Sequence, residues 1–220
     1  MKSYPIERVA SFDVDAQNCF TPLCPEELPV PGGHEIVSEL NSQGSFAKYR
    51  VGSKDAHSLS AIWLATKENP QFTKVEGENV DVRWNAHAIV GTKGYELLSG
   101  LPKVIDYDYF VFKGIELDLH PYGACYHDLK NCLSTGVIEY LHSKNVELII
   151  VGGLALDYCV KTTVMQLVDA GFDVVVNLAS TKAISEEGYT LTVAELKLLG
   201  VRFVKDSKDL SVDNGFVKVN

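Results

Sequence analysis

The sequence has no long apolar run, no dense cluster of basic residues and no CxxC pair. Its longest uncharged apolar stretch, 148–156, is too short to cross a bilayer, and the first residues lack the apolar segment of a leader peptide. With 20 Lys and Arg against 29 Asp and Glu, the formal charge of −9 is unsuited to phosphate backbones and anionic membranes. These absences argue against nucleic-acid and membrane partners, and they predict a cytoplasmic protein with a small-molecule partner.

The chain has enough apolar side chains to form one core without support from metals or disulfides. Of its 220 residues, 46% are hydrophobic, and no repeat, low-complexity tract or linker divides them. We therefore expect a single domain spanning residues 1–220. The five cysteines form no metal-type pair. Their odd number suits a reducing compartment with free thiols, one of which is a candidate nucleophile.

Short β-type runs alternate with helical periodicities along the chain. Each run ends near Asp, Gly, Lys or Ser, where a strand would stop. This order predicts a three-layer α/β/α fold in which helices cover a mainly parallel central sheet, with ligands beyond the carboxyl ends of the strands. The expected strands are 8–14, 46–52, 109–112, 146–151, 174–178 and 201–204, and the helical patterns lie at 36–40, 129–141, 160–168 and 191–199.

Two segments fall outside this alternation. Residues 58–106 are long, polar and interrupted by Gly and Pro, so we expect a structured excursion that serves as a functional loop or lid. The tail from about residue 206 carries Asp213-Asn214-Gly215 between β-prone runs, which is a hairpin signal. We expect the tail to serve packing or a contact with another subunit.

Three strand ends supply side chains that fit nucleophilic catalysis. The first strand delivers Asp13 and Asp15, which are rivals for one site because residues two apart share a face, and the third strand ends at Lys113. After the fourth strand, Asp157 is a candidate N-cap that would place Cys159 in the first turn of a helix. There the helix dipole and a nearby lysine favour the thiolate, and a carboxylate can carry the thiol proton. Each residue alone has an ordinary structural role, but together they indicate a site.

The second predicted strand is followed by an Asp-x-His pair, Asp55 and His57, and the next histidine downstream is His87. Mixed oxygen and nitrogen ligands with a vacant position suit Zn²⁺, Fe²⁺ or Mn²⁺, although this spacing alone is a weak metal signature. Of the other histidines, only His120 and His127 lie near a candidate site.

Five short motifs occur in the order typical of one family. The motifs are VDAQNCF at 14–20, SKDAH at 53–57, WNAH at 84–87, FKG at 112–114 and GLALDYCV at 153–160. Together they resemble the motifs of nicotinamidases within the isochorismatase-like cysteine hydrolase superfamily, and the resemblance runs from about residue 9 to 204. GLALDYCV is the most specific of the five, and each of the others is weak alone.

The resemblance implies hydrolysis of nicotinamide to nicotinate and ammonia through a cysteine thioester, as part of NAD salvage. Asp15, Lys113 and Cys159 match the family's catalytic triad, which assigns Asp15 rather than Asp13 to the site. A cis peptide is expected around Leu154-Ala155, and the amides that match Ala155 and Cys159 form the family's oxyanion hole.

The resemblance also implies ligands for a metal ion and for the substrate. The expected ion is Zn²⁺, with Fe²⁺ or Mn²⁺ as alternatives, and homo-oligomers are common in the family. The matching metal ligands are Asp55, His57 and His87, the side chains that enclose the pyridine ring match Phe20 and Trp84, and Tyr122 matches a tyrosine that closes the pocket.

The sequence departs from the family pattern at two places. Cys19 stands where many relatives carry an acid. Family members often supply another histidine soon after the Asp-x-His pair, but residues 58–63 contain none, so water or another group such as Asp81 would complete the coordination. Residues 58–82 match no motif of the family.

Two other functions remain open at this stage. A cysteine amidohydrolase of the same superfamily acting on a carbamoyl or ureido substrate would need the triad but no ring-binding metal. A non-catalytic interaction module would keep the fold and bind a partner through the excursion or the tail, but a decayed site should have lost part of its triad. An isochorismatase proper is disfavoured because that branch generally lacks the nucleophilic cysteine.

Overall fold

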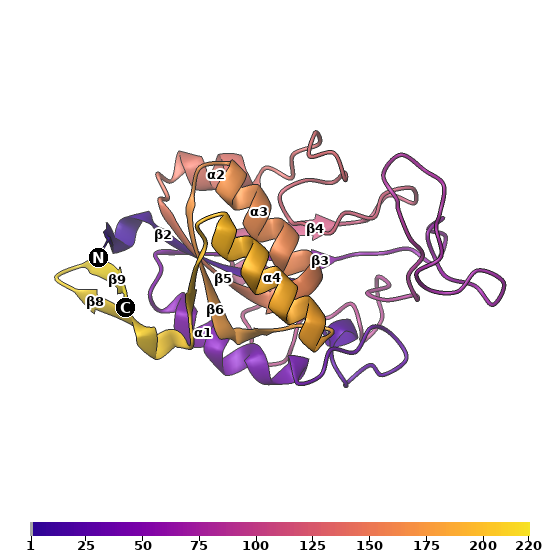
Figure 1. Ribbon diagram of the computed structural model, residues 1–220, viewed down its shortest axis with the longest axis horizontal. Helices are drawn as coiled ribbons and strands as arrows, with labels where there is room; N and C mark the ends of the chain where they lie inside the picture. The colour runs from indigo at the N-terminus through magenta and orange to yellow at the C-terminus, as the bar shows by residue number, and fades with distance from the viewer. Residues whose placement is uncertain (1) are drawn as a thin grey trace.

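The computed structural model describes residues 2–220, and its larger sheet has six strands in the order β4-β3-β2-β5-β6-β7 (Figure 1). All neighbouring strands in this sheet are parallel. Every strand expected from the sequence is present, and β3 extends three residues further than expected, as far as Asp55. The strands are β2 (Val9–Val14), β3 (Tyr49–Asp55), β4 (Tyr109–Lys113), β5 (Leu148–Leu154), β6 (Asp173–Lys182) and β7 (Arg202–Val204).

Helices cover both faces of this sheet, which confirms the three-layer α/β/α prediction. One buried cluster joins strand side chains to three helices on the same face, and a second cluster places Leu40 of α1 on the opposite face (Figure 1). The helices are α1 (Val37–Gly44), α2 (Val137–Ser143), α3 (Lys161–Asp169) and α4 (Glu186–Leu198).

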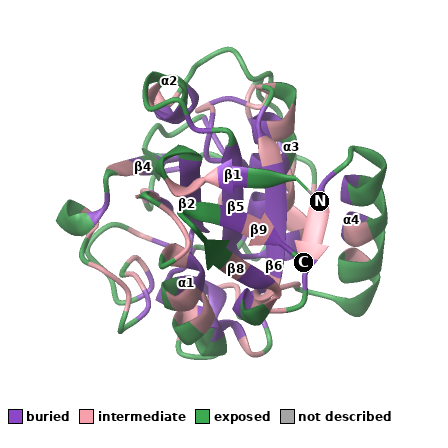
Figure 2. Cartoon of the chain, turned by 90° about the vertical axis from the view of Figure 1, so that its left-hand side faces the viewer, coloured by how far each residue is buried: buried purple, intermediate pink, exposed green. Residues whose placement is uncertain are grey.

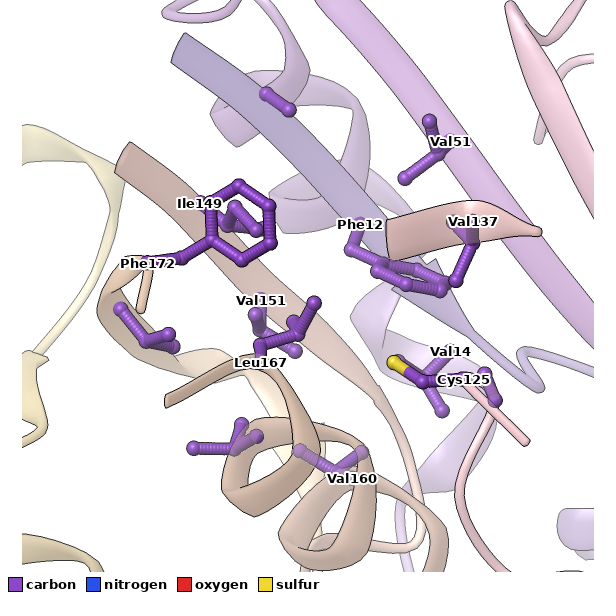
Figure 3. Close-up of a cluster of buried hydrophobic side chains, with 14 of the residues drawn as sticks. Phe12, Val14, Val51, Cys125, Val137, Ile149, Val151, Val160, Leu167 and Phe172 are labelled. Carbon is purple, nitrogen blue, oxygen red and sulfur yellow. The ribbon is translucent and has the colours of Figure 1, made fainter. Parts of the chain in front are cut away.

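The central strands are buried on both faces, as expected for a covered parallel sheet. All six residues of β2 are buried (Figure 2). Phe12 of β2 lies in the main cluster with Val137 of α2 and Leu167 of α3 (Figure 3). Because burial of each such side chain contributes about 1.5–3 kcal/mol, this cluster holds the strand ends that carry the site.

The helix expected over 129–141 is shorter than its periodicity indicates. Before it, the Asp128 carboxylate accepts hydrogen bonds from the amides of Cys132 and Leu133, at 2.9 and 2.8 Å, which closes a turn instead of a helix. Gly136 then adopts a φ of 84°, and α2 begins only after it. The apolar spacing over 129–136 was therefore not a helical face.

The two ends of the chain meet in a small antiparallel sheet of order β1-β9-β8. Its strands are β1 (Ser3–Pro5), β8 (Leu210–Asp213) and β9 (Phe216–Val219). The hairpin predicted in the tail is present, and Asn214 and Gly215 have the positive φ values of 49° and 79° that such a turn requires. This sheet lies at the opposite end of the molecule from the loops that follow the end of β3 (Figure 1).

Residues 58–106 contribute no strand to either sheet. Isolated bridges connect them to one another and to neighbouring loops, including the pairs Leu64–Trp84 and Asn79–Leu119. They also bury a cluster of their own that includes Trp63, Val80 and Trp84. The excursion is therefore structured, as predicted. No helix within residues 2–220 combines the length and the apolar character needed to cross a membrane.

Candidate active site

The structure brings the three candidate catalytic residues together at the carboxyl edge of the sheet. Asp15 directly follows β2, Lys113 is the last residue of β4, and Cys159 lies in the turn after β5. The Lys113 Nζ atom lies 3.0 Å from Oδ2 of Asp15 and 3.8 Å from Sγ of Cys159. Lys113 and Asp15 are fully buried. The lysine also pairs with the Asp55 carboxylate and donates to the Pro121 carbonyl at 3.2 Å.

The rival acid, Asp13, belongs to a different network. Its carboxylate accepts a 2.9 Å hydrogen bond from Nε of Arg50 and another of the same length from the Tyr107 hydroxyl. Asp15 instead accepts from the Ser53 hydroxyl at 2.7 Å. Asp13 is thus engaged away from Lys113, and Asp15 is the acid beside the lysine and the thiol.

Cys159 lies in a π-helical turn, Leu156–Val160, and not in the first turn of an α-helix. The peptide between Leu154 and Ala155 is cis. Asp157 is not the predicted N-cap, because its carboxylate accepts hydrogen bonds from the amides of Ile184 and Ser185, at 3.0 and 3.4 Å, ahead of α4.

The turn after β5 also requires close backbone approach. A Cβ on Gly153 would lie 1.9 Å from the Val14 carbonyl oxygen, and φ at this residue is 126°. Glycine therefore allows the end of β5 to lie against the end of β2 and to bring Cys159 near Asp15.

The buried surroundings of the Cys159 sulfur oppose the thiolate that the sequence favours there. Burial raises the pKa of the Cys159 thiol well above its ordinary value; Lys113 opposes this rise, and the Asp15 and Asp55 carboxylates add to it. Cys159 therefore rests as a thiol, and its proton needs an acceptor.

Asp15 is suited to accept that proton. Burial raises the pKa of Asp15, although the Lys113 ammonium opposes the rise. Burial alone would lower the pKa of Lys113, but the Asp15 and Asp55 carboxylates raise it well above its usual range, so the lysine stays charged. Oxygens of Asp15 and Asp55 and the sulfur of Cys159 all lie within 4.8 Å of one another, which is close enough for proton exchange after small movements.

Three buried histidines form a cluster beside this triad. Ligand atoms of His57, His87 and His120 lie within 4.8 Å of one another. Asp55 bridges the cluster and the triad, because its Oδ2 lies 3.5 Å from Nε2 of His57 and 3.8 Å from Nε2 of His87, while its other oxygen faces Lys113. The predicted ligands are thus adjacent, and His120 joins them from another loop.

Backbone carbonyls orient two of these rings. Nδ1 of His57 lies 2.9 Å from the Gly114 carbonyl oxygen, and Nδ1 of His87 lies 2.7 Å from that of Asn85. A Cβ on Gly114 would lie 2.3 Å from the His57 ring, so glycine is required there. Burial, reinforced by the neighbouring imidazole of His57, lowers the pKa of His87 to about 3 and that of His120 well below its usual value. Both rings are therefore neutral.

A mainly aromatic pocket opens above Cys159. Phe20, Trp84 and Tyr122, the expected substrate contacts, all line it, as do Ala155 and Cys159, whose amides the resemblance assigns to the oxyanion hole. The indole N–H of Trp84 donates to the Tyr122 hydroxyl at 3.2 Å. Further lining residues that the sequence did not indicate are Leu28, Tyr158 and Ile184.

Asp81 is not part of the histidine cluster. It lies on the exposed surface, where its carboxylate accepts a 2.8 Å hydrogen bond from the Tyr122 hydroxyl. The place expected for a further ligand is instead taken by His120. The sequence offered only one hint of this, the position of His120 shortly after the Lys113 motif. The irregular segment between β4 and α2 that carries His120 has no pattern from which its path could be inferred. Cys19 is buried, and His127 does not line the pocket.

Comparison with known proteins assigns the family. The model of the isochorismatase domain matches residues 14–206. This chain belongs to the isochorismatase-domain family. Its fold and its Asp15, Lys113 and Cys159 triad are those of a hydrolase of this family that resembles nicotinamidases.

Its relatives include proteins described as nicotinamidases. The nicotinamidase of Acinetobacter baylyi is 28% identical over 178 residues, which cover 80% of this chain and 81% of the relative. The solved nicotinamidase and pyrazinamidase of Acinetobacter baumanii has a TM-score of 0.83 and 25% identity, covering 92% of this chain and 98% of the other. A Leishmania infantum structure in complex with nicotinate has a TM-score of 0.77 and 26% identity, covering 91% and 93%.

Proposed function

We propose that this protein is a nicotinamidase, which hydrolyses nicotinamide to nicotinate and ammonia in NAD salvage. The observation that carries the proposal is the position of Lys113 Nζ, 3.0 Å from Asp15 and 3.8 Å from the Cys159 sulfur, beneath an aromatic pocket. The pocket wall suits a flat, neutral ring such as pyridine. The similarity to nicotinamidases, and to a solved protein in complex with nicotinate, supports the same substrate class.

The histidine cluster fits a transition-metal ion. The buried Nε2 atom of His57 has no hydrogen-bond partner among the described residues, and its Nδ1 atom is taken up by a backbone carbonyl, which leaves the Nε2 lone pair free. Imidazoles beside a carboxylate suit Zn²⁺, with Fe²⁺ or Mn²⁺ as alternatives. We therefore propose that His57, His87 and His120, with Asp55, hold one zinc ion. When bound, it would supply a Lewis-acid site for the pyridine nitrogen.

The first half of the reaction forms the acyl-enzyme. Asp15 takes the proton of the Cys159 thiol as the sulfur attacks the carboxamide carbon, and the Lys113 ammonium stabilises the negative charge that develops on the sulfur. Amides of Ala155 and Cys159 donate to the resulting oxyanion, each worth roughly 3–4 kcal/mol. Asp15 then protonates the departing nitrogen as the C–N bond breaks. Ammonia leaves, and a thioester remains on Cys159.

The second half of the reaction hydrolyses the thioester and releases nicotinate. A water molecule gives a proton to Asp15 and attacks the thioester carbon, and the C–S bond breaks with return of the proton to the Cys159 sulfur. The sum is one water consumed for each nicotinate and ammonia released. Asp15 thus alternates between base and acid, a role that suits a buried carboxyl whose pKa lies above its ordinary value.

Ammonia release from nicotinamide tests the substrate and the metal together. We expect turnover by the purified protein, loss of turnover after chelation, and recovery on addition of Zn²⁺, with no recovery in His57→Ala. Turnover that survives complete chelation would instead favour the carbamoyl or ureido class, which needs no ring-binding metal. Absence of turnover with every metal would contradict the proposal.

A further inference from the structure

The three imidazoles of the cluster are not held in the same way. His57 and His87 each direct Nδ1 at a backbone carbonyl, whereas neither ring nitrogen of His120 has a hydrogen-bond partner among residues 2–220. Ligating histidines are almost always oriented by such a partner. The ring of His120 must therefore be held by packing.

Trp63 supplies this packing. Its side chain is fully buried, and its ring centroid lies 4.3 Å from that of His120, 4.7 Å from that of His57 and 5.5 Å from that of His87. One indole thus contacts all three imidazoles. The contact with His57 is edge-to-face, an arrangement that favours one relative orientation of the rings.

Trp63 also connects the two irregular segments that carry His87 and His120. Its indole N–H donates to the Leu119 carbonyl at 3.0 Å, directly before His120. Its own carbonyl accepts from the Trp84 amide at 3.2 Å, three residues before His87. Since His57 is placed by the end of β3, Trp63 holds the two histidines that come from irregular segments against the one that the sheet positions.

We propose that Trp63 is a positioning residue that sets the affinity of the cluster for zinc by holding His120 and His87 in place. The inference rests on the metal site of the proposed function, but it does not depend on the identity of the substrate. Its consequence is measurable in the absence of any reaction.

Zinc affinity of the metal-stripped protein, measured by competition with a chromogenic chelator, tests this role. Trp63→Phe keeps an aromatic ring but removes the hydrogen bond to Leu119 and one of the two fused rings of the indole. We expect it to bind Zn²⁺ about 10- to 100-fold more weakly than the wild type. Tyr4→Phe is the matched control, because it also removes one hydrogen bond from a buried aromatic residue, here with Arg202 at the other end of the molecule. It should bind zinc as the wild type does.

A double-mutant cycle separates positioning from general destabilisation. If Trp63 acts by holding the ligand rings, Trp63→Phe should cost less affinity in the His120→Ala background than in the wild type. Unchanged zinc affinity in Trp63→Phe, or fully additive losses in the cycle, would overturn the inference.

A second measurement does not require Trp63 to be replaced. The chain has two tryptophans, so Trp84→Phe leaves Trp63 as the sole emitter. One equivalent of Co²⁺ should then quench its fluorescence, and unchanged emission at saturating Co²⁺ would contradict the contact. If the wild type binds no zinc, the metal site and this inference both fail. If the zinc results hold but nicotinamide is not hydrolysed, only the substrate assignment fails.

Discussion

The triad and the histidine cluster lie side by side but are built differently. Asp15, Lys113 and Cys159 lie at the carboxyl ends of three parallel strands of one sheet, β2, β4 and β5, whose register fixes their relative positions. His87 and His120 come from irregular segments connected by isolated bridges and aromatic contacts. Backbone register therefore holds the reacting groups, whereas side-chain packing holds the proposed metal ligands. Substitutions at the sheet edge should therefore abolish amide hydrolysis, whereas substitutions in the loops should reduce the affinity for the metal ion without abolishing it.

Replacement of Asp15, the proposed base at the edge of the sheet, should lower activity more than replacement of His120 or Tyr122. Asp15→Asn removes the acceptor of the thiol proton, and we expect kcat for nicotinamide to fall by about 10²- to 10⁴-fold. Asp13→Asn is its matched control, because this carboxylate lies two residues away and pairs with Arg50 and Tyr107. Steady-state assays should show near-normal kcat in Asp13→Asn, whereas equal losses in both variants would contradict the assignment.

Replacement of His120, a proposed metal ligand in an irregular segment, should reduce the affinity for zinc while the protein remains folded. We expect His120→Ala to bind Zn²⁺ about 10- to 100-fold more weakly, by analogy with the loss of groups that support metal sites. Equilibrium competition with a chelator measures this. His34→Ala, at an exposed histidine, should bind zinc normally. Wild-type affinity in His120→Ala would show that this ring is not a ligand.

The pH dependence of kcat/KM should follow the ionisation of the Asp15 carboxyl group. Because the carboxylate must be ionised to accept the thiol proton, activity should fall as pH decreases, by about tenfold per unit below the pKa of the free enzyme's base. Burial raises the pKa of Asp15, so this acid limb should lie above the value of about 3.9 that is ordinary for aspartate. A profile that stays flat down to the ordinary value would argue against Asp15 as the base.

The smallest effect is expected at the outer wall of the pocket. Tyr122→Phe removes the hydrogen bonds with Asp81 and Trp84, at 2.8 and 3.2 Å. A loss of about 0.5–1.5 kcal/mol should raise KM by about 2- to 10-fold and leave kcat nearly unchanged. Asp81→Asn, which retains an acceptor for the Tyr122 hydroxyl, should have a weaker effect. A large fall in kcat for Tyr122→Phe would instead indicate that this hydroxyl takes part in the catalytic step.

The same contrast explains what the sequence could predict. Alternating strands and helices place the triad at one edge, because parallel strands bring their carboxyl ends together. Asp15 could be separated from Asp13 only by resemblance to the family, since both acids lie near the same strand end. The reason is visible in the partners of Asp13, which come from β3 and the loop before β4 and have no local sequence signature.

The roles of Trp63 and His120 could not be predicted. Trp63 and His120 lie in irregular segments on either side of β4, where neither period nor motif indicates which side chains meet. The effect of burial on the Cys159 thiol could not be predicted for a related reason. A helix terminus and a lysine favour thiolate, but complete burial beside two carboxylates outweighs them, and burial of that kind is a tertiary property.

The central claim is that Cys159 is the nucleophile of an amidase, and ammonia release from nicotinamide by Cys159→Ala tests it most directly. Loss of a hydrolase nucleophile lowers kcat by up to about 10⁶-fold, so this variant should be inactive while its melting temperature stays close to that of the wild type. Cys132→Ala, at an exposed cysteine, should retain full activity. Persistent ammonia release by Cys159→Ala, or its equal loss in Cys132→Ala, would contradict the account.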